Sequence, residues 1–206
     1  MSVAVQSTPE RAIGTVHPAP PRVYRFSVKQ YQRMIETGVI TENDRVELLE
    51  GCVVKKMPHN PPHDGTINRM NRRLLRMLPD DWLLRVQSAI TLPRSKPEPD
   101  LAIVRAPEEL YFKRHPVPRD IALIIEIADT SLLYDRQYKG AIYARVRIPF
   151  YWIVNLAAAR IEVYSLPRAG RTPAYRERHD YGKEEVVPLI LAGHELGRLA
   201  VRDLLP

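Results

Sequence analysis

The sequence predicts an α/β fold with a central mixed β-sheet flanked by helices, and three observations support this prediction. The segment "IALIIEIA", Ile121 to Ala128, is apolar on both faces, as expected for a central strand covered on each side. Apolar residues recur at helical spacing from Thr66 to Leu78. The segments "FYWIVNL" and "RIEVYSL" follow one another as a pair of strands.

The chain divides into a short tail and one long folding unit. Residues 1–22 contain small residues, four prolines and no sustained period, which predicts a flexible tail. Residues 23–206 are enough for one well-formed hydrophobic core, so we expect a single domain there.

The first elements of this domain are a helix, a hairpin and a second helix. Ser27 is a cap and Gly38 a stop for a short helix. In "DRVELLEGCVVKKM", apolar alternation on both sides of Glu50 and Gly51 predicts two strands joined by a turn. We expect the Pro-rich "PHNPPHDG" to break the chain, and the amphipathic helix to begin at Thr66 with arginines on its outer face.

The second half of the chain supplies most of the sheet. Trp82 to Leu92 predicts one or two strands, and Pro99 to Val104 another. "SLLYDRQYKGAIYARV" predicts a helix after the central strand. After the strand pair we expect a looser set of short strands that ends near Leu205.

Composition narrows the cellular setting. The single Cys52 cannot form an intrachain disulfide, which favours a reducing, cytoplasmic location. No apolar run is long enough to span a bilayer, and the N-terminus does not resemble a secretion signal. A net charge of +7, carried mostly by arginine, suits a phosphate-rich partner, although genomic base composition explains arginine enrichment equally well.

Common catalytic motifs are missing from the sequence. It has no GxGxxG, P-loop, GxSxG, HExxH or CxxC, so the usual nucleotide-binding, esterase and zinc-protease classes lack support. His59 and His63 flank the Pro-rich loop and could bind a metal, but two histidines without a third ligand are more often polar loop residues.

Two carboxylates stand out because of where they fall in the predicted strands. Asp100 lies near the start of its predicted strand, and Glu126 lies near the end of the next one. Because side chains alternate along a strand, each carboxylate points to a definite face of the sheet. Antiparallel pairing would bring them together at one end of the sheet. Such a carboxylate pair suits Mg²⁺ and phosphodiester hydrolysis, although a strand glutamate can instead pair with an arginine.

The following helix adds a lysine to this pair. Asp135 and Lys139 fall on a stripe that is otherwise apolar, so the Lys139 ammonium could lean over the sheet end toward Glu126. There it would orient or activate the attacking water, or stabilise the charge on the phosphate. An ordinary ion pair between Asp135 and Lys139 on a half-exposed helix is the alternative.

In its motifs the chain resembles the PD-(D/E)xK nuclease superfamily, and within it the Uma-type putative endonuclease family, often described as a restriction-endonuclease-like domain of unknown function. The resemblance covers about residues 24–165. Its pieces are "RVELLEG" (45–51), a helix led by His63, "PEPDLAIV" (97–104), "LIIEIADTS" (123–131), "DRQYKGAIYA" (135–144) and "IPFYWIVN" (148–155).

The resemblance implies a restriction-endonuclease-like core, a metal held by Asp100 and Glu126, and a catalytic lysine. It also implies that Glu47 can join the metal site. Ala128 stands where the superfamily pattern has a lysine, and members of the family similarly carry the lysine in the next helix, as Lys139 does.

These observations predict a Mg²⁺-dependent endonuclease acting on DNA, with Mn²⁺ as a possible substitute and arginines of the Thr66 to Leu78 helix on the phosphates. The alternatives are an inactive nucleic-acid-binding module that keeps the fold, and hydrolysis of another phosphate-containing substrate. A homodimer is a further expectation, because single-domain nucleases that cut both strands often work in pairs.

Overall fold

The computed structural model describes residues 23–206, so the expected tail at 1–22 lies outside the described residues. A six-stranded sheet with the order β3-β4-β5-β6-β7-β8 forms the centre of the fold. Its strands are β3 (Trp82–Val86), β4 (Leu101–Arg105), β5 (Ile121–Ala128), β6 (Phe150–Asn155), β7 (Arg160–Arg168) and β8 (Ala174–Gly182).

The sheet is mixed, as predicted. Neighbouring strands pair antiparallel except β5 and β6, which run parallel. A parallel pair needs a crossover connection, which is the helical segment of α3 (Leu132–Tyr134), the π-helical turn η4 (Asp135–Lys139) and α4 (Gly140–Arg145). Every residue of β5 is buried, which confirms its central position.

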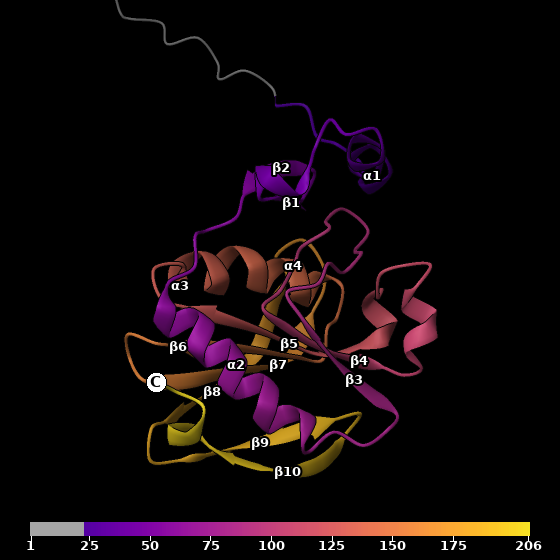
Figure 1. The fold of residues 1–206 in the computed structure, drawn as a ribbon. Coiled ribbons are helices and arrows are strands. Elements are labelled where there is room, and N and C mark those ends of the chain that lie inside the picture. The colour runs from indigo at the N-terminus through magenta and orange to yellow at the C-terminus, as the bar shows by residue number, and fades with distance from the viewer. Residues whose placement is uncertain (1–22) are drawn as a thin grey trace, which may run out of the picture.

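Each face of the sheet has its own cover (Figure 1). Helix α2 (Pro61–Leu75) and the hairpin of β9 (Val186–Leu191) and β10 (His194–Ala200) pack on the face that carries Leu101 and Ile125. Helix α4 packs on the opposite face, which carries Ala102 and Ile124. The short helices are η1 (Glu42–Asp44), η2 (Glu108–Tyr111), η3 (Pro118–Asp120) and η5 (Val201–Asp203).

The N-terminal elements lie beyond one end of the sheet. Figure 1 shows helix α1 (Val28–Glu36) and the hairpin of β1 (Val46–Leu49) and β2 (Cys52–Lys55) on this side. The Lys96 N–H donates to the Leu48 carbonyl at 2.7 Å and ties the hairpin to the main body. Gly51 makes the predicted turn with φ +81°, and a Cβ there would lie 2.8 Å from the Arg25 Cβ.

Helix α2 and strand β8 differ from the sequence prediction. Helix α2 begins at Pro61, not Thr66, because the Asn60 side chain accepts from the His63 N–H and prolines fit the first helical turn. The Trp82 to Leu92 segment forms one strand, Trp82–Val86, which agrees with the predicted one or two. Strand β8 is nine residues long rather than short.

Within residues 23–206, no helix combines the length and apolar character needed to cross a bilayer.

Candidate active site

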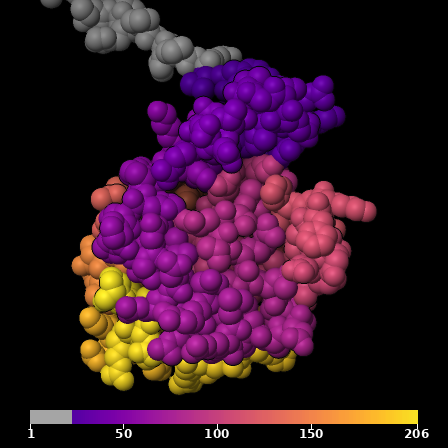
Figure 2. All heavy atoms as spheres, viewed as in Figure 1, coloured from indigo at the N-terminus to yellow at the C-terminus, as the bar shows by residue number. Residues whose placement is uncertain are grey.

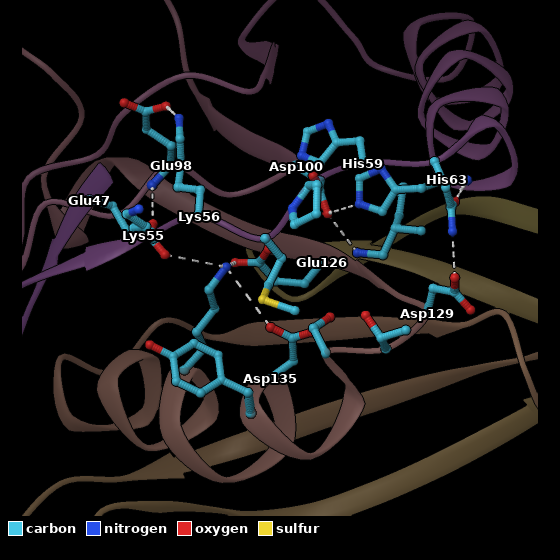
Figure 3. A pocket seen from close by; sticks show the side chains of 18 residues that line it. Glu47, Lys55, Lys56, His59, His63, Glu98, Asp100, Glu126, Asp129 and Asp135 are labelled. Atoms are coloured by element: carbon cyan, nitrogen blue, oxygen red, sulfur yellow. Dashed lines mark hydrogen bonds and ion pairs between the residues drawn. The ribbon is translucent and has the colours of Figure 1, made fainter. Parts of the chain in front are cut away.

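A polar pocket lies where β4 begins and β5 ends (Figure 3). Its walls come from the β1–β2 hairpin, the first turn of α2, the ends of the two strands and the π-helical turn η4. Segments far apart in the sequence therefore meet at this end of the sheet.

Strand register brings the two predicted carboxylates together. Strands β4 and β5 pair antiparallel with Leu101 opposite Ile125, so the preceding Asp100 reaches the level of Glu126. The Ile127 N–H donates to Asp100 Oδ2 at 2.8 Å. The Asp100 side chain thus accepts a hydrogen bond from β5 just beyond the last paired residue of β4, Leu101. Both carboxylates are buried, with 7% of Asp100 and 3% of Glu126 exposed.

The lysine predicted from the helix stripe reaches the same place. Lys139 Nζ lies 3.0 Å from Glu126 Oε1 and 3.9 Å from both Glu47 Oε1 and Asp135 Oδ1. Only 12% of the Lys139 side chain is exposed. Ala128 is fully buried in the apolar cluster beneath the crossover helix, so the ammonium beside Glu126 arrives from η4 and not from β5.

Hydrogen bonds engage one oxygen of each acidic side chain. The Tyr143 hydroxyl donates to Glu126 Oε1 at 2.7 Å, and the Glu98 N–H donates to Glu47 Oε2 at 3.0 Å. The Ser131 hydroxyl donates to Asp135 Oδ2 at 2.5 Å. Each carboxylate is therefore held in one orientation.

Two oxygens are left for a ligand. Among residues 23–206, Asp100 Oδ1 and Glu126 Oε2 have no hydrogen-bond or ion-pair partner, whereas the other oxygen of each group has two close polar neighbours. Hard oxygen donors on adjacent strands are the ligands that Mg²⁺ and Mn²⁺ prefer. The donor set therefore fits a divalent cation.

The site carries more buried negative charge than its own cations offset. Burial raises the pKa of Glu126 to about 8, although the Lys139 ammonium opposes this shift and the neighbouring carboxylates add to it. Burial also raises the pKa of Asp135. Burial alone would lower the pKa of Lys139, but Glu126 and the other carboxylates outweigh it and raise that pKa, so Lys139 is an ammonium at neutral pH.

His63 lies beside Asp100, a contact that the sequence did not reveal. Its Nε2 is 3.2 Å from Asp100 Oδ2, and the residue is 8% exposed. Burial favours the neutral imidazole, but the interaction with Asp100 outweighs it and raises the pKa of His63. The pKa of Asp100 is lowered, because His63, the Ile127 N–H and Lys139 together overcome the effect of burial. The start of α2 at Pro61 makes this contact possible.

His59 and His63 have a third potential ligand nearby, Asp64, which the sequence prediction did not consider. Ligand atoms of His59, His63 and Asp64 lie within 4.8 Å of one another. However, the two imidazole rings stack with centroids 4.4 Å apart and planes at 23°. Two nearly parallel rings cannot both aim a nitrogen lone pair at one ion, so this arrangement does not present a formed metal site.

Tyr143 and Ser131 are the partners that sequence reasoning missed. Tyr143 follows Lys139 by four residues, so the stripe that indicated Asp135 and Lys139 also passes through it. Ser131 precedes Asp135 by four residues and offered the same signal. The backbone contacts of Asp100 and Glu47 have no such signal, because they depend on strand pairing.

Comparisons with known proteins agree with the fold. A family model described as Uma2, putative restriction endonuclease, matches residues 28–201. The crystal structure of a putative nuclease belonging to DUF820 from Anabaena variabilis is similar, with a TM-score of 0.57 and 12% sequence identity. The similarity covers 87% of this chain and 97% of that one. No curated protein matched the sequence.

Proposed function

The chain belongs to the Uma2 family of putative restriction endonucleases, and we propose that it is a metal-dependent endonuclease that hydrolyses phosphodiester bonds of DNA. The observation that carries this proposal is the pair of unengaged oxygens, Asp100 Oδ1 and Glu126 Oε2, on adjacent strands beside the Lys139 ammonium. This arrangement supports assigning the site to the PD-(D/E)xK pattern, with the lysine supplied by the helix that follows the strand.

Asp100 and Glu126 would hold Mg²⁺ or Mn²⁺. When bound, the cation would polarise a phosphate oxygen and lower the pKa of a coordinated water. Glu47 Oε1 lies 3.9 Å from the ammonium and is positioned to join the site directly or through water. A divalent cation would also offset the excess negative charge of the four buried carboxylates.

Lys139 would act as a charged donor. Its raised pKa keeps the ammonium protonated at neutral pH in the metal-free protein, so it suits orientation of the attacking water and stabilisation of negative charge on the phosphate. The contacts with Glu126, Glu47 and Asp135 hold the ammonium above the strand ends.

The decisive experiment measures nicking of supercoiled plasmid in Mg²⁺ and Mn²⁺. Asp100→Ala and Asp100→Asn should abolish nicking while thermal melting shows a folded protein. Asp81→Asn is the matched control, because Asp81 is exposed just before β3, where β3 pairs with the far end of β4. Equal nicking by wild type and the Asp100 variants would overturn the proposal.

The second candidate is an inactive nucleic-acid-binding module, favoured by the buried Ala128 at the superfamily's lysine position. Titration calorimetry separates the two, because this candidate predicts salt-sensitive DNA binding without binding of Mn²⁺.

We further propose a cytoplasmic location, consistent with the free thiol of Cys52. We also propose a homodimer if the enzyme cuts both strands, and gel filtration with light scattering would test it.

A further inference from the structure

The outer face of helix α2 carries a cluster of arginines outside the pocket described above. Arg72 and Arg73 lie three and four residues after Arg69, and the C-cap Arg76 lies four and three residues after them, so the four form one stripe along the helix. Arg202 of η5 joins them, and these five arginines with Asp203 line one hollow. Figure 2 shows α2 (purple) and the C-terminal segment (yellow) side by side on this surface.

The charge of this arginine cluster is largely uncompensated. Five arginines line the hollow with Asp203, and Glu184 lies 3.8 Å from Arg202, so a formal charge of +3 remains. Asp203 lies 3.2 Å from Arg73, and Arg69 donates to the Leu205 carbonyl. Within the described part of the chain, Arg72 and Arg76 have no carboxylate within ion-pair distance, and both are exposed.

Helix stability accounts for only part of the arginine cluster. Basic residues in the last turn interact favourably with the helix dipole, which accounts for Arg72 and Arg73. The dipole does not explain Arg202, which reaches the same hollow from a different element. Guanidinium groups that converge from two elements are typical of sites that bind phosphate.

The position of the cluster relates it to the pocket. His63, in the pocket, lies on the first turn of the same helix. With a rise of about 1.5 Å per residue, Arg69 lies about 9 Å and Arg76 about 20 Å farther along the helix axis. One strand of duplex DNA has a phosphate about every 3.4 Å along its axis, so the stripe can meet about three successive phosphates.

We propose that the arginine cluster binds the sugar–phosphate backbone of duplex DNA and directs the duplex from helix α2 toward the pocket. This inference rests on the proposed function for its choice of DNA, but it concerns binding and not cleavage. A row of charges about 10 Å long suits an extended polyanion better than a single phosphate ion.

The test is fluorescence anisotropy of a short labelled duplex in EDTA, where a metal-dependent enzyme cannot cut, over about 50 to 200 mM salt. In Arg72→Ala/Arg76→Ala, the slope of log affinity against log salt should fall in magnitude by about 2, because about 0.9 is lost per phosphate contact. Arg72→Lys/Arg76→Lys keeps the charges and should restore the slope.

Arg168→Ala/Arg171→Ala is the matched control. Both residues are exposed at the β7–β8 connection, which lies at the sheet end opposite to the carboxylates because β7 runs back from the end of β6. This variant should keep the wild-type slope. A slope that both double-alanine variants lower equally would overturn the proposal, because the charge effect would then be nonspecific.

Two further outcomes count against the proposal. One is an unchanged slope in Arg72→Ala/Arg76→Ala; the other is tighter binding of single-stranded RNA than of the duplex through the same arginines. Competition with inorganic phosphate should require far higher concentrations than competition with unlabelled DNA. If duplex binding depends on these arginines but the nicking assay stays negative, the binding proposal stands and the proposed nuclease activity fails.

Discussion

Glu126 is the residue whose state depends most on what the pocket contains. Its carboxyl is buried, and three further carboxylates add to the cost of ionisation while one ammonium opposes it. Without a cation, burial raises its pKa from 4.5 to about 8. The folded metal-free protein therefore binds a proton at Glu126 more tightly than the unfolded chain does.

This difference predicts how stability depends on pH in EDTA. A group whose folded pKa is raised stabilises the fold fully below its unfolded value and loses that contribution as pH rises through the folded value. The free energy of unfolding should therefore fall between roughly pH 4.5 and pH 8, on the order of a few kcal/mol. Glu126→Gln, which keeps the shape, should lack this part of the fall.

Urea unfolding of both proteins at several pH values in EDTA provides the measurement. Only the difference between wild type and Glu126→Gln is attributed to Glu126, since other groups titrate equally in both. Parallel stability curves for the two proteins across this range would contradict the burial of an ionisable Glu126.

His63 is expected to position Asp100 without touching the cation. Its Nε2 lies 3.2 Å from Asp100 Oδ2, so it fixes the oxygen that does not face the ligand. Removing such a supporting partner typically weakens metal binding by about 10- to 100-fold. His63→Ala should show this loss of Mn²⁺ affinity by calorimetry, and His63→Gln, which keeps a donor, should recover part of it. His179→Ala alters an exposed histidine on β8 and should bind Mn²⁺ normally.

At the scale of elements, the crossover between β5 and β6 supplies the ammonium. The π-helical turn η4 places Asp135 and Lys139 on the side facing the strand ends, and Tyr143 follows on α4. π-helical turns inside α-helices are frequent at functional sites. A helix thus provides the charge that the buried Ala128 cannot.

Lys139 can act as a catalytic donor or can only maintain the fold of the pocket, and mutation should distinguish these two roles. Lys139→Met should lower nicking by about 10²- to 10⁴-fold, the range for a positioned catalytic donor. Mn²⁺ binding should persist or strengthen, because the ammonium that repels a cation is gone. The exposed Lys183→Met is the control. An equal loss of Mn²⁺ binding and nicking in Lys139→Met would indicate that the lysine only maintains the fold of the pocket.

The sequence predicted those parts of the site that follow from local periodicity. Alternation along two strands placed Asp100 and Glu126 on faces that meet, and helical spacing placed Lys139 with Asp135. The predicted start of α2, Thr66, lies five residues after the observed start at Pro61. The reason is that prolines can either interrupt a chain or occupy the first turn of a helix. The contact of His63 with Asp100 depends on that start and on packing between distant segments, so no local pattern contained it.

At the scale of the whole molecule, the pocket joins elements that lie far apart in the sequence. Glu47 belongs to the β1–β2 hairpin, Asp100 and Glu126 to the central sheet, and Asp135 to the crossover. A cation shared by these carboxylates would bind the folded chain but not the unfolded one. Folding and metal binding should therefore be coupled.

The melting temperature measures this coupling. At a Mn²⁺ concentration about 100 times the dissociation constant, binding adds about 2.7 kcal/mol to the stability of the folded state. For a chain of this length that corresponds to a rise of about 5 to 10 °C over the protein in EDTA. Asp100→Asn should show no rise with Mn²⁺, whereas Asp81→Asn should behave as wild type does. If Mn²⁺ leaves the wild-type melting temperature unchanged, these carboxylates do not share a cation, and their buried charge must be offset by protonation and by Lys139 alone.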